Sequence, residues 1–147
     1  MTDRSEVLAD FDVEGVRAVV LYVRGSHYCG YVGVGRLHPW WGHGYDRLSE
    51  LYGDEEDGYR SIPVHGGLTY SGAGDEYPVP SEKPTWWYGF DCGHAGDVMA
   101  DRPSIMRDFY QPDDPYRTEW TLERAIEEVT QLAKRAANDA IRFEGAC

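Results

Sequence analysis

Lysine and cysteine are scarce in this chain, and long apolar runs are absent. Arginine supplies almost all of the positive charge, since Lys83 and Lys134 are the only lysines. The 3 cysteines are an odd and sparse set, which argues against a disulfide framework and is typical of a reducing compartment. No stretch approaches the roughly 20 apolar residues of a membrane span, and the first residues form no apolar signal segment. We therefore expect a cytoplasmic protein with no membrane partner.

Several motifs that carry catalysis are also missing. The chain has no Gly-x-Ser-x-Gly nucleophile elbow and no phosphate-binding loop, and residues 33–38 stop short of a dinucleotide fingerprint. It has no His-Glu-x-x-His and no paired Cys-x-x-Cys, which are the familiar zinc motifs. A catalytic or metal site would therefore have to be assembled from separate segments.

The charge balance narrows the choice of partner. The chain has 26 acidic and 14 basic residues and a net charge of -12. Such a field repels a phosphate backbone, so we expect no general nucleic-acid binding. The 147 residues suit a single domain, residues 1–147. Aromatic residues make up 14% of the chain, which predicts a well-filled core and prompts a search for an aromatic-lined pocket.

The hydrophobic pattern predicts strands first and one long helix last. The segments with strand character are residues 16–24, 27–34, 62–70 and 85–91. Residues 45–52 have the spacing of a short helix, and Thr121 can cap a long amphipathic helix that begins at Leu122. The acidic run at residues 54–57 lacks the alternating carboxylates of a calcium loop and predicts a solvated turn. The expected fold is α+β, a mainly antiparallel sheet with the C-terminal helix on one face and a short helix in the middle.

Two segments, residues 64–71 and 86–97, concentrate histidine, aspartate, cysteine and glycine near the ends of predicted strands. If the two strands are neighbours, alternation places polar side chains of both on one face, and the glycine-rich chain after residue 91 adds more at the same end. The candidate ligand-binding residues are His65, Gly66, Gly67, Thr69, Trp87, Asp91, Cys92, His94 and Asp97.

Three chemical interpretations of this group remain open. The candidate ligands of a divalent metal with an open position for water are His65, Asp91, His94 and Asp97. Alternatively, Cys92 is a nucleophile with His65 or His94 as its base. In the third, backbone amides flanked by glycine cradle an anion or other ligand beside Trp86 or Trp87. Against all three stands a structural interpretation, in which Asp91 caps a loop and Cys92 is a small buried apolar residue.

The same two segments resemble a group of small, largely uncharacterised phage and prophage proteins. Members carry a Val-His-Gly-Gly-Leu-Thr-Tyr-Ser stretch followed by Trp-Trp-x-Gly-Phe-Asp-Cys-x-His-x-Gly-Asp, which correspond here to residues 64–71 and 86–97. The resemblance extends over the middle of the chain, and Gly93 is a mild departure from it. It implies an accessory gene of a bacterial or archaeal virus and transfers no catalytic residue.

We therefore expect, first, a non-enzymatic viral accessory protein that inhibits or sequesters a host factor in the host cytoplasm. The partner would be a host defence protein or a small nucleotide-like ligand. The alternative is a small metal-dependent hydrolase that uses the two histidines and two aspartates, and a thiol enzyme comes third. An aromatic loop around Trp40 and Trp41, if exposed, would suit the interface of a homo-oligomer.

Overall fold

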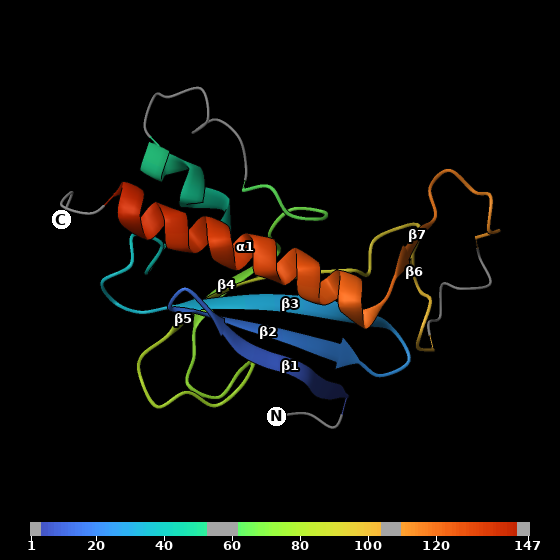
Figure 1. The fold of residues 1–147 in the computed structure, drawn as a ribbon, viewed down its shortest axis with the longest axis horizontal. Helices are drawn as coiled ribbons and strands as arrows, with labels where there is room; N and C mark the ends of the chain where they lie inside the picture. Colours follow the sequence, from blue (N-terminus) through green and yellow to red (C-terminus); the bar gives the residue numbers. More distant parts are fainter. Residues whose placement is uncertain (1–3, 53–61, 104–109, 144–147) are drawn as a thin grey trace.

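The structure is a computed structural model that describes residues 4–52, 62–103 and 110–143; the acidic run at residues 54–57 lies outside these ranges. Five antiparallel strands form one sheet, and a single long helix, α1, lies across one face of it (Figure 1). The predicted α+β fold is thus confirmed. No helix of the described ranges is both long and apolar enough to cross a membrane.

The sheet has the order β1-β2-β3-β5-β4. Its strands are β1 (Ser5–Val13), β2 (Val16–Val23), β3 (His27–Val34), β4 (Tyr70–Ala73) and β5 (Trp86–Asp91). The first three form a meander, and β5 then pairs with β3 and carries β4 on its outer side. At one edge, β1 contains an irregularity between Val7 and Ala9, and at the other, β4 is only 4 residues long.

The sheet separates two cores, and β2 contributes to both. Its Ala18 and Val20 face α1, whereas Val19 and Leu21 face a smaller cluster on the opposite side. This explains why residues 16–24 read as a strand with apolar residues on both faces. Strand β5 alternates in the same way, because Tyr88 and Phe90 pack in the core under α1 and Trp87 packs in the other cluster.

Helix α1 (Leu122–Arg142) begins where the sequence predicts. The hydroxyl of Thr121 accepts a hydrogen bond from the backbone N–H of Arg124 at 3.1 Å, which satisfies one of the free amides of the first turn. The buried face presents small and branched residues to β2 and β3, namely Ala125, Val129, Leu132, Ala133 and Ala136. Burial of a side chain such as Leu132 contributes about 1.5–3 kcal/mol.

The aromatic loop after β3 is anchored to α1. His38 accepts a hydrogen bond from the backbone N–H of Trp40 at Nδ1 (3.0 Å), so its Nε2–H donates to the carbonyl of Ala136 (2.7 Å). The indole of Trp40 donates to Oδ2 of the buried Asp139 at 3.0 Å. Because Trp40 is fully buried, the expectation of an exposed interface at this residue is wrong; the half-buried Trp41 packs near Trp86.

The strand predicted over residues 62–70 is wrong. The chain forms a loop as far as Thr69, and β4 begins at Tyr70. The reason is local, because Gly66 and Gly67 have φ angles of 69° and 78°, which no regular strand contains. The short helix predicted at residues 45–52 exists as a 3-10 helix, η1 (Tyr45–Tyr52).

Two short strands after the sheet lead into α1. β6 (Asp97–Met99) pairs in parallel with β7 (Thr118–Trp120), and together they lie beyond the N-terminal end of the helix (Figure 1). The pairing places Met99 opposite Trp120 and holds the start of α1 next to the chain that leaves β5. The chain that leaves β5, the paired strands β6 and β7, and the start of α1 therefore meet at one end of the sheet.

Candidate functional site

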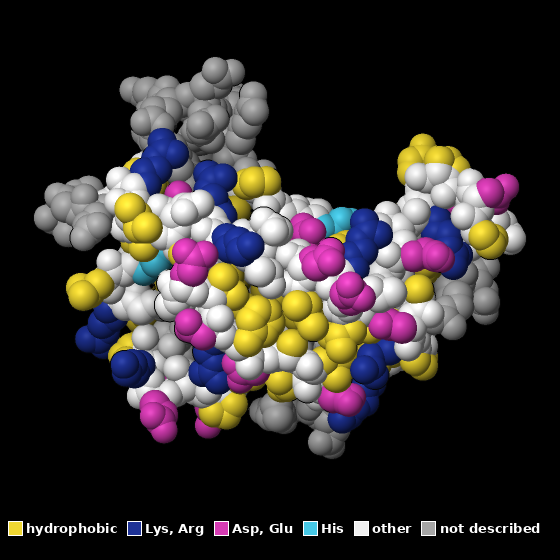
Figure 2. All heavy atoms as spheres, viewed as in Figure 1, with side chains coloured by type: hydrophobic (Ala, Val, Ile, Leu, Met, Phe, Trp, Pro, Cys, Tyr) yellow, Lys and Arg dark blue, Asp and Glu magenta, His cyan; other side chains and the backbone are white. Residues whose placement is uncertain are grey.

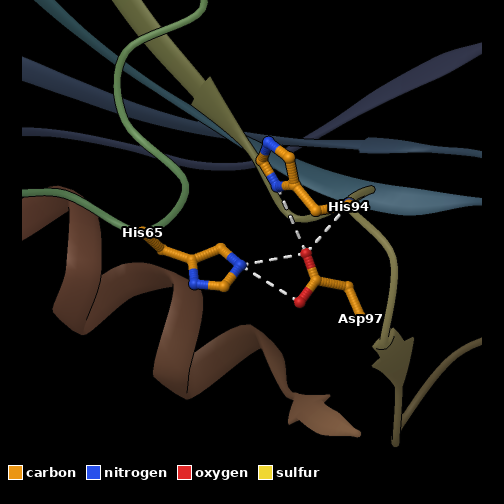
Figure 3. A group of neighbouring side chains, drawn as sticks. All are labelled: His65, His94 and Asp97. Atoms are coloured by element: carbon orange, nitrogen blue, oxygen red, sulfur yellow. Dashed lines mark hydrogen bonds and ion pairs between the residues drawn. The ribbon is translucent and has the colours of Figure 1, made fainter. Parts of the chain in front are cut away.

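Three side chains converge at this end of the sheet: His65, His94 and Asp97 (Figure 3). Nε2 of His65 lies 2.9 Å from Oδ2 and 3.0 Å from Oδ1 of Asp97. Nδ1 of His94 lies 3.4 Å from the same Oδ2. All three ligand atoms fall within 4.8 Å of one another, and the two rings approach the carboxylate from different sides.

His65 is positioned by the glycine-containing loop before β4. Its backbone N–H donates to Oε2 of Glu128 on α1 at 2.6 Å, and its ring packs on the indole of Trp120 with centroids 4.7 Å apart. A Cβ atom on Gly66 would lie 2.3 Å from the ring of His94. Only glycine therefore allows this loop to pass so close to the second histidine.

Asp97 is the buried centre of the group, with 2% of its surface exposed. Besides the imidazole of His65, its carboxylate accepts the backbone N–H of His94 at 3.0 Å and the indole N–H of Trp120 at 3.2 Å. A buried carboxylate is costly unless several donors satisfy it, and each of these hydrogen bonds is strengthened by the charge. Asp97 is consequently held in one orientation.

His94 brings an imidazole nitrogen that has no hydrogen-bond partner within the described part of the chain. This atom, Nδ1, is buried, although 37% of the side chain as a whole is exposed. It lies 3.4 Å from the carboxylate of Asp97 and 3.6 Å from Oδ1 of Asp91. A buried imidazole nitrogen between two carboxylates and without a hydrogen-bond partner is suited to binding a cation.

Asp91 lies at the rim of the group and also has a structural role. Its Oδ1 accepts the backbone N–H of Gly93 at 2.9 Å, and its Oδ2 accepts the hydroxyl of Thr69 at 3.3 Å. It therefore caps the loop that follows β5, as one interpretation of the sequence expected. Its side chain is 31% exposed and remains accessible beside His94.

The structure places two of the candidate residues elsewhere. Cys92 is fully buried in the core under α1, and burial, together with the charge of Asp97, raises the pKa of its thiol. A buried thiol that stays protonated cannot act as the nucleophile, so that interpretation is wrong. Trp87 is buried on the opposite side of the sheet, where its indole donates to the carbonyl of Gly74 at 3.2 Å, and it does not line the group.

Three neighbours of the site were not predicted from the sequence. Trp120 and Glu128 come from β7 and α1, and no local pattern relates them to residues 64–97. His27 of β3 lies beneath Gly93, where a Cβ would come within 3.0 Å of its ring. Burial lowers the pKa of His27, and the nearby carboxylates of Asp91 and Asp97 oppose this effect.

The site is a surface site rather than a deep cavity. Histidine side chains reach the surface beside α1 in the face shown by Figure 2. A larger hollow, of about 910 Å³, lies at the other end of the sheet and is lined by residues that include Arg17 and Lys83. The side chains of His65 and His94 are thus partly exposed, whereas Nδ1 of His94 and the carboxylate of Asp97 are buried.

Two imidazoles and one buried carboxylate form a set of donors suited to a divalent transition metal. Sequence reasoning brought these three side chains together, and the structure adds the indole that fixes the carboxylate. Comparisons of the chain with protein-family models, curated protein sequences and solved structures find no match, so its function rests on the chemistry of this group.

Proposed function

We propose that this protein is a small metal-dependent hydrolase that binds one divalent transition-metal ion, of the zinc type, through His65, His94 and Asp97. The observation that supports this most directly is the buried Nδ1 of His94. This nitrogen has no hydrogen-bond partner among the described residues. It lies near the carboxylate of Asp97, which the imidazole of His65 also contacts.

The spacing of the donor atoms suits such an ion. Bonds of about 2.0–2.1 Å to a tetrahedral zinc ion place neighbouring ligand atoms roughly 3.3 Å apart. The two nitrogen-to-oxygen distances to Oδ2 of Asp97 are 2.9 Å and 3.4 Å, on either side of that value. Movements of a few tenths of an ångström in the partly exposed histidine rings would bring both distances to that value.

The surroundings of the donors support the same function. Carboxylate ligands are commonly held by further hydrogen bonds, and Asp97 has such bonds from Trp120 and from the amide of His94. Three protein ligands leave one position for water, and a zinc ion lowers the pKa of that water to about 7. Asp91, partly exposed and 3.6 Å from Nδ1 of His94, is placed to take the proton.

The first test is metal binding. Protein stripped with chelator and reloaded with one equivalent of Zn²⁺ should retain one ion in native mass spectrometry. His94→Ala should lose it, and His43→Ala, which removes a histidine outside the group, should keep it. A wild-type protein that retains no ion, or a His94→Ala variant that retains it equally, would contradict the proposal.

The second test is turnover. The zinc-loaded protein is assayed with p-nitrophenyl acetate and p-nitrophenyl phosphate as simple ester probes. Asp91→Asn should keep the metal, because Asp91 is not among the three ligands, and should hydrolyse the probe more slowly than wild type. Equal rates in the two proteins would remove Asp91 from the mechanism.

The viral accessory binding function expected from the sequence stays a prediction. A metal-binding surface is compatible with it, since a metal can also hold a ligand without turning it over. Zinc retention without hydrolysis of either probe would favour that function and its host protein or nucleotide-like partner.

A further inference from the structure

We propose that Trp120 is a positioning residue that determines the metal selectivity of this site. Its indole N–H donates to Oδ1 of Asp97, whereas Oδ2 is the oxygen that lies near both imidazoles, so the carboxylate should bind the ion through Oδ2. This inference rests on the proposed metal site and concerns a residue that acts through Asp97.

The hydrogen bond joins two buried groups. Trp120 is 1% exposed and Asp97 is 2% exposed, and the distance from Nε1 to Oδ1 is 3.2 Å. Oδ2 is the oxygen that lies near both imidazoles, 2.9 Å from Nε2 of His65 and 3.4 Å from Nδ1 of His94. Both oxygens lie near Nε2 of His65, but only Oδ1 accepts the indole N–H, and only Oδ2 lies near the imidazole and the backbone N–H of His94.

The indole is fixed from all sides. Its ring packs against His65 with centroids 4.7 Å apart, and the guanidinium of Arg124 covers it at 4.8 Å from the ring centre. The backbone carbonyl of Trp120 accepts the N–H of Ala100 at 2.7 Å, next to the paired strands β6 and β7. Trp120 therefore cannot turn away from Asp97 without disturbing both the small sheet and the start of α1.

The number of oxygens that a carboxylate offers influences which metal it prefers. Zinc favours four ligands, whereas manganese(II) favours carboxylate and water oxygens in six-coordinate sites. An indole that occupies one oxygen of Asp97 restricts the coordination number and favours zinc. Removal of this donor should free Oδ1 and reduce the difference between the two metals.

The chain contains its own matched control. Trp40 donates its indole N–H to the buried Asp139 at 3.0 Å, in the loop anchored to α1, and makes none of the contacts of His65, His94 and Asp97 described above. Trp120→Phe and Trp40→Phe both keep an aromatic ring and lose one hydrogen bond to a buried carboxylate. Only the first should alter metal binding.

Isothermal titration of both variants and wild type with Zn²⁺ and with Mn²⁺ tests the proposal. For Trp120→Phe we expect zinc affinity to fall about tenfold, the lower end of the effect of losing such an outer hydrogen bond. Manganese affinity should fall less, so that the ratio between the metals narrows, and Trp40→Phe should keep the wild-type ratio. Absorption by bound Co²⁺ should weaken in Trp120→Phe as coordination rises above four.

The outcomes separate this inference from the proposed function. A wild-type protein that binds neither metal contradicts the metal site itself. A wild-type protein that binds zinc while Trp120→Phe and Trp40→Phe show the same ratio overturns the role of Trp120 alone. If Trp120→Phe fails to fold, the indole N–H signals of wild type are followed by NMR during addition of Zn²⁺. The Trp120 signal should shift and the Trp40 signal should not; an unmoved Trp120 signal overturns the inference.

Discussion

Replacement of Asp97 by asparagine should destabilise the metal-free protein strongly. The carboxylate accepts N–H groups from His65, from the backbone of His94 and from Trp120. Asparagine replaces one oxygen with an NH₂ group, which must then face one of these donors. A buried donor left unsatisfied costs about 1–3 kcal/mol, and the remaining bonds lose the benefit of the charge, so we expect a total near 3 kcal/mol.

Thermal unfolding in the presence of chelator measures this cost. For a domain of this size, 3 kcal/mol corresponds to a decrease in Tm of roughly 10 °C. Asp91→Asn is the matched control, because this aspartate is 31% exposed and asparagine can still accept the N–H of Gly93, so its cost should stay below about 1 kcal/mol. If Asp97→Asn unfolds within 1 or 2 °C of wild type, the hydrogen-bond network around the carboxylate does not have the importance assigned to it.

Three further predictions concern glycine, thiol and histidine residues. Gly66→Ala introduces a Cβ 2.3 Å from the ring of His94 at a φ of 69° and should destabilise the fold by more than Gly67→Ala, which meets nothing within 4 Å; urea unfolding compares them. Cys92 should resist a thiol reagent in native protein at pH 8 and react after addition of guanidinium, since it is fully buried; rapid native labelling would contradict this. Burial lowers the pKa of His38 below the ordinary 6.5, and the hydrogen bonds of its ring suit the neutral form. The stability that this neutral histidine contributes is therefore present above pH 6.5 and is lost as the pH falls below it. The free energy of unfolding of His38→Gln should fall less than that of wild type between pH 7 and pH 5.

The sequence predicts the interior of this sheet better than its edges. Residues 16–24 and 85–91 are correct as strands because β-branched and aromatic residues fill both faces of an inner strand. β1 gives no such signal, because Asp10 and Asp12 are exposed and interrupt its apolar residues. The loop at residues 62–69 resembles a strand in sequence because Val64 and Leu68 pack against the core, and an alternating pattern does not distinguish a strand from an irregular backbone that buries the same residues.

The site could be predicted only in part. The grouping of His65, His94 and Asp97 is as expected, but His65 reaches it from a loop before β4 and not from the strand predicted over residues 62–70. Trp120 lies 23 residues after Asp97 in the chain, so nothing local in the sequence relates it to Asp97. Trp87 was assigned to the site because alternation shows which residues share a face but not which face is open to solvent.

The two edges of the sheet bear on how this protein behaves at high concentration. An exposed edge strand can recruit the edge of another molecule and begin aggregation. In β1, the irregularity between Val7 and Ala9 and the exposed charges of Asp12 and of the Asp10–Arg17 ion pair oppose such pairing. β4, at 4 residues, is too short to template a long ladder. Edge-to-edge growth of this sheet is therefore opposed at β1 and at β4 by different means.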